Sequence, residues 1–412
     1  MKKILIITFY FPPLSGGASL RMWRFCKSLA NKLEIEVLTI KSPKRSNEID
    51  FNLLSKIKNI KIHRTNRFKL NKVWRFISKL KINPRIFMPE ANFGWVLHAI
   101  REGNKILKKS RFDYLLGVYP TFSSMLVSYK LSKFNKIPLI IDLHDLFYDT
   151  LKHDLPISLY RHFYSHLEGK ILSHASIVSV ITPNFREIIT EKHKLPREKF
   201  VIVPNTVDLK EFKSIKSSKK QEFIISYVGF IEEYHLEGII LLIEALNLLK
   251  KEFINYNIKF RLIGHIKPRM KKKILEMDTF KVTEILGFVN KNKSNLFMME
   301  SDILYLTLSP YHRYMLELRT TIPSKLIEYI GCGKPILAYL PKGTSQQLIT
   351  ENNLGLVLTK FNSIDLSILI RQLFENEELR NSLSENALKL AQKYDSKVIY
   401  EEFFRKTIIG NK

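Results

Sequence analysis

Cysteine is almost absent from this sequence, whose 412 residues include only Cys26 and Cys332. Two cysteines provide no disulfide framework, and neither lies at a spacing typical of metal ligands. No apolar run approaches the roughly 18 residues that a membrane-spanning helix requires. A lysine pair before the apolar residues 4–11 has features of a signal peptide, but the following prolines and amphipathic helix favour an opening β-strand. We therefore expect a reducing, cytoplasmic location.

Acidic residues are scarce in the first half of the chain. The net charge is +28, and residues 1–204 contribute most of it, with 36 basic and 15 acidic residues. From Lys56 to Arg85 there are eleven basic residues and no acidic one, with Trp74 and Phe76 among them. This pattern predicts a basic amphipathic surface for anionic lipid. Nucleic acid is the competing partner, and a general lysine bias explains some of the charge but not its asymmetry. We favour the membrane and expect no nucleic acid.

The fold class follows from a repeated alternation of short apolar runs and helical patterns. The runs of strand length are residues 4–9, 35–40, 114–118, 138–143, 176–181, 200–203, 223–229, 258–263, 282–286, 303–308 and 336–340. Near-continuous apolar strands that alternate with helices are typical of parallel sheets covered on both faces. The sequence therefore predicts two doubly wound α/β domains, residues 1–204 and residues 205–412.

In the first domain, Gly16 and Gly17 lie in the turn between the first strand and its helix. Glycine lets the backbone approach a ligand closely, although a plain tight turn is an equal alternative. The helical pattern that follows places apolar residues on one face and Arg21, Arg24 and Lys27 off that face.

A histidine between two carboxylates follows the strand of residues 138–143. Asp142, His144 and Asp145 lie at the carboxyl edge expected for that strand. One carboxylate could orient the imidazole, which could then act on a substrate hydroxyl. The alternative is a polar loop histidine of no special role.

In the second domain, Pro323 and Ser324 mark the start of a helix. The first turn of such a helix favours a diphosphate, and Lys325 would add a positive charge. Glu328, one turn deeper, suits the hydroxyls of a ribose. The alternative is that Lys325 and Glu328 form a surface pair of little consequence.

The segment P-S-K-L-I-E-Y-I-G-C-G-K-P-I-L-A, residues 323–338, resembles the donor site of the GT-B glycosyltransferases of group 1, family 4. Gly16-Gly17, His144 and residues 205–208 occur in the same order as in that family. The resemblance implies two Rossmann-like domains that face each other across a cleft, with a last helix, residues 396–409, that packs back on the first domain. It implies a retaining hexosyltransferase that uses a nucleotide-sugar, with His144 and Asp145 at the reacting sugar.

The chain departs from the family's pattern around the ribose. The family has a first glutamate eight residues before Glu328, where this chain has Thr320, and Glu317 lies close enough to substitute. His265, after the strand of residues 258–263, is a candidate for contact with the base.

The usual diphosphate cations are also missing. Phe230 and Glu237 occupy the positions where the family often has an arginine and a lysine. The resemblance then leaves the diphosphate to Arg319, Lys325 and the helix start. Because the chain contains no Asp-x-Asp, we expect no metal held by that motif and no cofactor besides the nucleotide-sugar substrate.

The acceptor that the resemblance implies is a glycan, such as one linked to a polyprenyl diphosphate, in surface-polysaccharide biosynthesis at the inner face of the membrane. Two other functions remain open. One is a non-hydrolysing nucleotide-sugar 2-epimerase of the same fold, and the other is a non-catalytic protein that binds membranes or nucleic acid through its basic surface.

Overall fold

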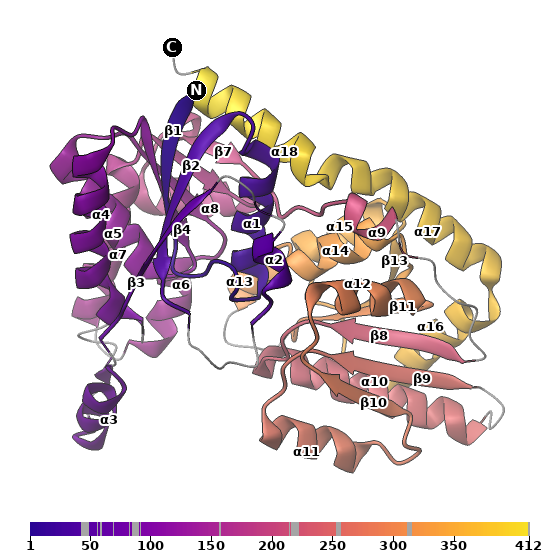
Figure 1. Cartoon of the computed structure of the whole chain (residues 1–412). Coiled ribbons are helices and arrows are strands. Elements are labelled where there is room, and N and C mark those ends of the chain that lie inside the picture. Colours follow the sequence, from indigo (N-terminus) through magenta and orange to yellow (C-terminus); the bar gives the residue numbers. More distant parts are fainter. Residues whose placement is uncertain are drawn as a thin grey trace. The chain divides into compact units, whose positions relative to one another are not determined.

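The computed structural model describes the chain apart from residues 43–48, 56, 58–59, 69, 82, 85–89, 91, 156–157, 214, 216–221, 253–256, 311–314 and 411–412. The chain forms two compact units (Figure 1). Unit 1 comprises Met1–Pro204 with Lys397–Lys412, and unit 2 comprises Asn205–Ser396. Each unit contains one parallel sheet with helices on both faces. The predicted fold class of two doubly wound α/β domains is confirmed.

Unit 1 has a seven-stranded sheet in the order β3-β2-β1-β4-β5-β6-β7. Its strands are β1 (Lys2–Ile7), β2 (Leu33–Ile40), β3 (Lys61–Thr65), β4 (Tyr114–Tyr119), β5 (Leu139–Leu143), β6 (Ile177–Val180) and β7 (Phe200–Ile202). In the centre, Ile4 aligns with Ile35 of β2 and with Tyr114 of β4, both in parallel register. The strand order reverses between β1 and β4, and doubly wound sheets bind ligands at the carboxyl edge of such a point.

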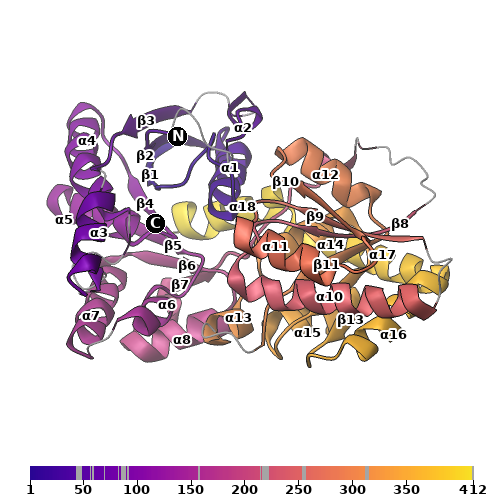
Figure 2. The same cartoon turned by 90° about the horizontal axis from the view of Figure 1, so that it is seen from below.

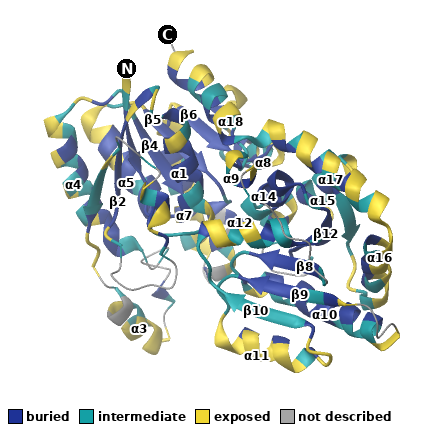
Figure 3. Cartoon of the chain, turned by 45° about the vertical axis from the view of Figure 1, so that its right-hand side comes forward, coloured by how far each residue is buried: buried dark blue, intermediate teal, exposed yellow. Residues whose placement is uncertain are grey.

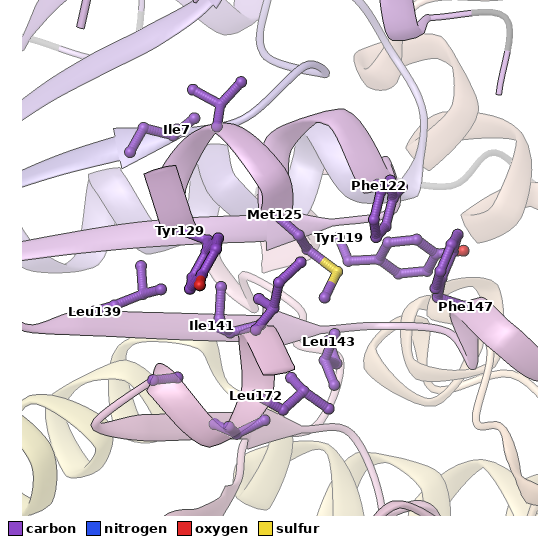
Figure 4. Packing of buried hydrophobic residues seen from close by; sticks show 14 of the residues in the cluster. Ile7, Tyr119, Phe122, Met125, Tyr129, Leu139, Ile141, Leu143, Phe147 and Leu172 are labelled. Carbon is purple, nitrogen blue, oxygen red and sulfur yellow. The ribbon is translucent and has the colours of Figure 1, made fainter. Parts of the chain in front are cut away.

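Helices cover both faces because successive β1 side chains alternate between two apolar clusters. Leu5 and Ile7 join the cluster of α4 (Val96–Lys109), α5 (Phe122–Asn135) and α7 (Ser158–His174). Figure 4 shows part of this cluster, with Met125 of α5 beside Ile141 of β5. Ile4 joins the cluster of α1 (Gly17–Leu29) and α18 (Ser396–Phe403) on the other face.

The remaining helices of unit 1 are shorter or lie at its margins. They are α2 (Asn52–Ser55), α3 (Asn71–Lys79), α6 (Phe147–Leu151) and α8 (Pro183–His193). After α18 the chain continues as a π-helix, Phe404–Ile409. The rings of Tyr400 and Phe403 lie 5.3 and 5.9 Å from the ring of Phe25, so this C-terminal segment packs on α1.

Unit 2 has a six-stranded parallel sheet in the order β10-β9-β8-β11-β12-β13, which reverses between β8 and β11. Its strands are β8 (Phe223–Val228), β9 (Ile258–Ile263), β10 (Thr283–Gly287), β11 (Ile303–Thr307), β12 (Ile336–Tyr339) and β13 (Gly355–Leu358). Figure 3 shows the inner strands as buried and the edge strand β10 as half-buried. The carboxyl edge between β8 and β11 is therefore surrounded by well-packed strands.

The helices of unit 2 again form two layers. One face carries α10 (Glu233–Glu252), α11 (Pro268–Met277) and α16 (Ser363–Glu375), and Figure 2 shows α10 and α11 together on it. The other face carries α12 (Lys291–Glu300), α14 (Ser324–Cys332) and α17 (Glu377–Ala391). Shorter helices are α9 (Lys210–Lys213), α13 (Met315–Thr320) and α15 (Thr344–Glu351). Across the ranges given above, no helix is both long and apolar enough to cross a membrane.

Candidate functional site

Two glycine turns close the carboxyl edge of the sheet in unit 2. Gly229 follows β8 with φ 139°, and Gly264 follows β9 with φ 141°. Both values lie where side chains are disfavoured. A Cβ on Gly264 would lie 1.9 Å from the carbonyl oxygen of Gly229, and a Cβ on Gly229 would lie 3.3 Å from Cε of Lys325. The glycines thus let both turns and the side chain of Lys325 meet at this edge.

Helix α14 begins at the same edge, as the sequence predicts. Pro323 precedes it, and the half-buried Ser324 and Lys325 are its first two residues. The first turn of a helix carries backbone N–H groups and the positive end of the helix dipole, which together attract anions. The helix ends at Gly333, whose φ of 69° is left-handed. This short helix therefore presents an anion-attracting end next to Gly229.

The amine of Lys325 is enclosed by aromatic side chains. Its Nζ donates to the hydroxyl of Tyr227, lies 4.4 Å from the centre of that ring, and lies 3.1 Å from Nε2 of His235. Burial lowers the pKa of Lys325 to about 7, against a smaller opposing effect of the negative charge of Glu232. Its amine therefore titrates near neutral pH.

Glu328 lies deeper on α14 and is only 9% exposed. Its Oε1 lies 2.8 Å from Nζ of Lys291, the first residue of α12. The alternative of an exposed pair between Lys325 and Glu328 is therefore wrong. Lys291 was not singled out from the sequence, because nothing in the pattern of α12 indicates a partner 37 residues away.

The positions without the usual cations carry an acid and an aromatic ring. Glu237 of α10 accepts hydrogen bonds from the hydroxyl of Tyr339, at 2.8 Å, and from that of Ser309. The ring of Phe230 lies 6.2 Å from the ring of the half-buried His265. Neither Glu237 nor Phe230 supplies a positive charge at this edge.

Helix α13 carries the other residues predicted for the donor. Glu317 is half-buried in its first turn, and Arg319 is exposed near its end. The hydroxyl of Thr320 donates to the carbonyl of Leu316 at 2.9 Å, within the helix. Residues 311–314, which lead into α13, lie outside the described residues.

In unit 1, His144 belongs to a buried polar network. His144 is 8% exposed, and its Nε2 lies 2.7 Å from Oδ2 of Asp142. The same carboxylate accepts hydrogen bonds from Nε and Nη2 of Arg21, at 2.9 and 2.8 Å, and from the hydroxyl of Ser179, at 2.6 Å. Burial opposes the charge of Asp142, but Arg21 and His144 outweigh it and hold the pKa of Asp142 well below its usual range. The histidine is thus oriented by a carboxylate that stays charged.

The expectation that Arg21 and Arg24 lie off the buried face of their helix is wrong. They are 3% and 2% exposed. Arg21 also donates to the carbonyls of Val203 and Pro204, both at 2.8 Å. Because its partners are far away in the sequence, the helical pattern alone could not reveal that this arginine is buried.

Gly16 and Gly17 lie in the turn between β1 and α1. This turn is at the carboxyl edge of β1. Gly16 has φ 110° and precedes α1, and Gly17 is its first residue. Asp145, next to His144, is half-buried, and burial raises its pKa against the opposing effect of His144 and Arg21. The predicted residues of unit 1 thus lie at one sheet edge, around the pair Arg21–Asp142.

The predicted basic surface includes α3 and its flanks. Four apolar side chains are exposed there. Phe76 is 62% exposed, and the other three are Phe68, Val73 and Leu80. Arg64 is half-buried and donates to the carbonyls of Ile40, at 3.3 Å, and Pro12, so it is not part of an exposed surface. Lys56, Lys58, Lys69 and Arg85 lie outside the described residues.

No group of three or more histidine, cysteine, aspartate or glutamate side chains in the described ranges is arranged to hold a metal ion.

Comparison with known proteins identifies the class that this fold and these sites define. Residues 15–211 match the family described as Glycosyltransferase Family 4, and residues 208–390 match the family described as Glycosyl transferases group 1. Together the two matches span nearly the whole chain. The chain belongs to the group 1, family 4 glycosyltransferases of GT-B fold, and it is a transferase of sugars.

Individual proteins similar to this chain include glycosyltransferases at low sequence identity. A protein described as an uncharacterized glycosyltransferase, from Methanocaldococcus jannaschii, is 23% identical over 95% of this chain and 94% of its own. Sucrose-phosphate synthase of Thermosynechococcus elongatus has a TM-score of 0.74 at 15% identity, with both chains covered completely. Anabaena HepE in complex with UDP has a TM-score of 0.67 at 15% identity, also with complete coverage. At these identities the solved structures show a shared fold.

Proposed function

We propose that this glycosyltransferase transfers a hexose from a nucleotide-sugar to a glycan or lipid-linked acceptor, with retention of the anomeric configuration, in surface-polysaccharide biosynthesis. The observation that carries the donor assignment is the position of Lys325 in the first turn of α14, against the Gly229 turn. Helix dipole, backbone N–H groups and an amine there form a site for the charge that develops on a leaving diphosphate. The UDP bound to a protein of the same fold makes UDP the first nucleotide to test.

We assign one part of the donor to each predicted residue at this edge. Lys325 and Ser324, with the exposed Arg319, hold the diphosphate. Glu328, fixed by its ion pair with Lys291, accepts hydrogen bonds from the ribose hydroxyls. Glu317 takes the place of the family's first glutamate, and His265 contacts the base.

We assign His144 to the sugar of the donor. Its Nε2 is engaged by Asp142, so the imidazole is held in one orientation and leaves Nδ1 as the nitrogen that can polarise a substrate hydroxyl. Asp145 beside it adds a carboxyl group with a raised pKa. Gly16 and Gly17 let the backbone at the start of α1 approach the donor.

The exposed side chains of α3 support a membrane surface, and a lipid-linked acceptor would be consistent with it. Its exposed Phe76 and Val73, with Arg75 and Lys79 on the same helix, combine shallow insertion with attraction to anionic headgroups. A peripheral position at the inner face of the membrane would give the enzyme access to an acceptor on a polyprenyl carrier.

A ligand screen followed by product analysis tests the proposal. UDP, GDP, ADP, CDP and dTDP are compared for thermal stabilisation, which reaches about 2.7 kcal/mol at 100 times the dissociation constant. The nucleotide-sugar of the best base is then followed by NMR, and we expect slow hydrolysis with initial release of the sugar in the donor's own anomeric form. Lys325→Met should abolish both effects, whereas Lys272→Met, on the exposed face of α11, should change neither.

Two outcomes would contradict the proposal. Conversion of the nucleotide-sugar to its 2-epimer would identify the epimerase of the same fold. Absence of stabilisation and turnover with every nucleotide would favour a non-catalytic binding protein.

A further inference from the structure

Among the described residues, few groups close to Lys325 can compensate an ammonium charge. The hydroxyl of Tyr227, on β8, accepts a hydrogen bond from the amine, and the imidazole of His235, on α10, faces the amine. Glu232 acts on it through charge alone, and its carboxylate lies 3.7 Å from Nζ of Lys267. On its own helix, Glu328 is engaged with Lys291 of α12. Within the described part of the chain, the groups against the amine are therefore a phenol and an imidazole.

The hydrogen bonds of His235 determine which of its nitrogens carries a proton. The side chain is buried, and its Nδ1 accepts from the backbone N–H of Glu232 at 2.9 Å. A nitrogen that accepts a hydrogen bond has a free lone pair, so in this arrangement the proton of the neutral imidazole is on Nε2. Nε2 is the atom that lies 3.1 Å from Nζ of Lys325.

An N–H group at Nε2 needs an acceptor, and an ammonium has none. A neutral amine accepts from Nε2 through its lone pair and still donates to Tyr227. The hydroxyl of Tyr227 in turn donates to the carbonyl of Phe230 at 2.9 Å. Burial keeps the pKa of Tyr227 well above its usual value, so that hydroxyl retains its proton. Every donor in the chain from Glu232 to Phe230 then has an acceptor.

We infer that His235 is a positioning residue that holds Lys325 as a neutral amine in the free protein, and that a nucleoside diphosphate charges this amine by proton uptake on binding. The inference rests on the proposed donor site. The negative charge of the diphosphate supplies the stabilisation that an ammonium lacks in the free site. The incoming proton comes from solvent, and no covalent bond forms or breaks.

Proton uptake is measured by calorimetric titration of the whole protein with UDP in HEPES and in Tris, buffers whose ionisation enthalpies differ. At about pH 8 the terminal phosphate, with a pKa of about 6, is already ionised and contributes little. With Lys325 titrating near 7, the wild type should take up close to one proton for each UDP, about 0.9. Lys325→Arg, which is always charged, should take up none.

His235→Gln separates the positioning role from simple support of the fold. The amide oxygen of glutamine can accept from an ammonium, so Lys325 should already be charged and uptake should fall by at least half. Binding of UDP by the wild type at about pH 8 without proton uptake would overturn the inference.

A measurement without nucleotide distinguishes failure of this inference from failure of the donor assignment. The ligand-free protein is labelled with a trace of acetic anhydride across the pH range, and the peptides are quantified by mass spectrometry. Lys325 should reach half of its maximal reactivity near pH 7, far below the value of about 10.4 that is ordinary for a lysine. Half-reactivity of Lys325 at that ordinary lysine value would overturn the inference, whether or not any nucleotide binds. A low value for Lys325 without binding of any nucleoside diphosphate would refute the donor assignment instead.

Discussion

Ion pairing with Lys291 fixes the carboxylate of Glu328 in one orientation. Both side chains are nearly buried, and charges taken out of water are tolerated only when they are closely paired. Removing either partner therefore affects the stability of unit 2 as well as any ligand that the carboxylate holds. The effect on stability can be separated from the effect on the ligand because only Glu328 lies on α14, whereas Lys291 lies on α12.

Glu328→Gln should lower both stability and nucleotide affinity. Loss of the charge removes the ion pair of the buried Lys291, which costs about 3 kcal/mol of unfolding free energy. Loss of charged hydrogen bonds to the ribose should weaken UDP binding by about 1–3 kcal/mol. Denaturant unfolding and calorimetric titration measure the two quantities.

The control is the double variant Glu328→Gln with Lys291→Met. It replaces the buried cation by an apolar side chain and should recover most of the lost stability. UDP affinity should stay low in the double variant. Recovery of affinity together with stability would show that Glu328 serves only the fold.

His144→Ala should lower turnover by about a hundredfold or more, the ordinary effect of losing a positioned proton-transfer or polarising group. Affinity for UDP should stay within about twofold, because the residues proposed for the nucleotide belong to unit 2. The matched control is His162→Ala on the exposed face of α7, which should change neither value. Turnover of His144→Ala close to that of the wild type would leave this residue with a structural role only.

At the scale of elements, α3 exposes both apolar and basic side chains. We expect Arg75→Glu with Lys79→Glu to weaken binding to vesicles that contain phosphatidylglycerol, since each cation near the surface contributes about 1 kcal/mol. Phe76→Ser should weaken it separately by removing inserted apolar surface. Sedimentation at about 0.05 M and about 0.5 M salt should show binding that falls as screening increases.

Matched controls keep net charge and apolarity constant. Lys272→Glu with Lys273→Glu on α11 makes the same change of charge, and Phe134→Ser removes a phenylalanine that is 73% exposed on α5. Neither should alter vesicle binding. Absence of wild-type binding at low salt would refute the membrane surface, and stronger binding to RNA than to vesicles would favour nucleic acid.

Most elements of this fold were predictable because they have local signals. Apolar runs of strand length predict most strands of both sheets, and Pro323 with Gly333 marks the two ends of α14. The strands β3 and β13 were not predicted, because β3 lies in the basic segment and β13 is a short strand at the edge of its sheet. The partners of site residues were not predictable in the same way. Arg21 meets Asp142 across 121 residues, and Lys325 meets His235 across 90, so only the folded sheet brings them together. Local patterns therefore predict where a site lies, and the fold decides which charges in it are paired.

At the scale of the whole molecule, each unit carries one buried thiol. Cys26 lies on α1 of unit 1, and Cys332 lies at the end of α14 in unit 2. Burial raises the pKa of both thiols, that of Cys332 to about 12. The thiolate is the reactive form, so each cysteine should react only when its own part of the structure opens. The two thiols therefore report separately on the two units.

A nucleotide that binds to unit 2 should protect Cys332 and leave Cys26 unprotected. At a UDP concentration 100 times its dissociation constant, opening of the bound unit becomes about a hundredfold rarer. Alkylation of Cys332 in the native protein, followed by mass spectrometry of its peptide, should slow by that factor where opening limits the reaction. The Cys26 peptide in the same sample is the internal control. Selective protection of Cys26 would move the nucleotide site to unit 1, and equal protection of both thiols would show that the two units open as one cooperative body.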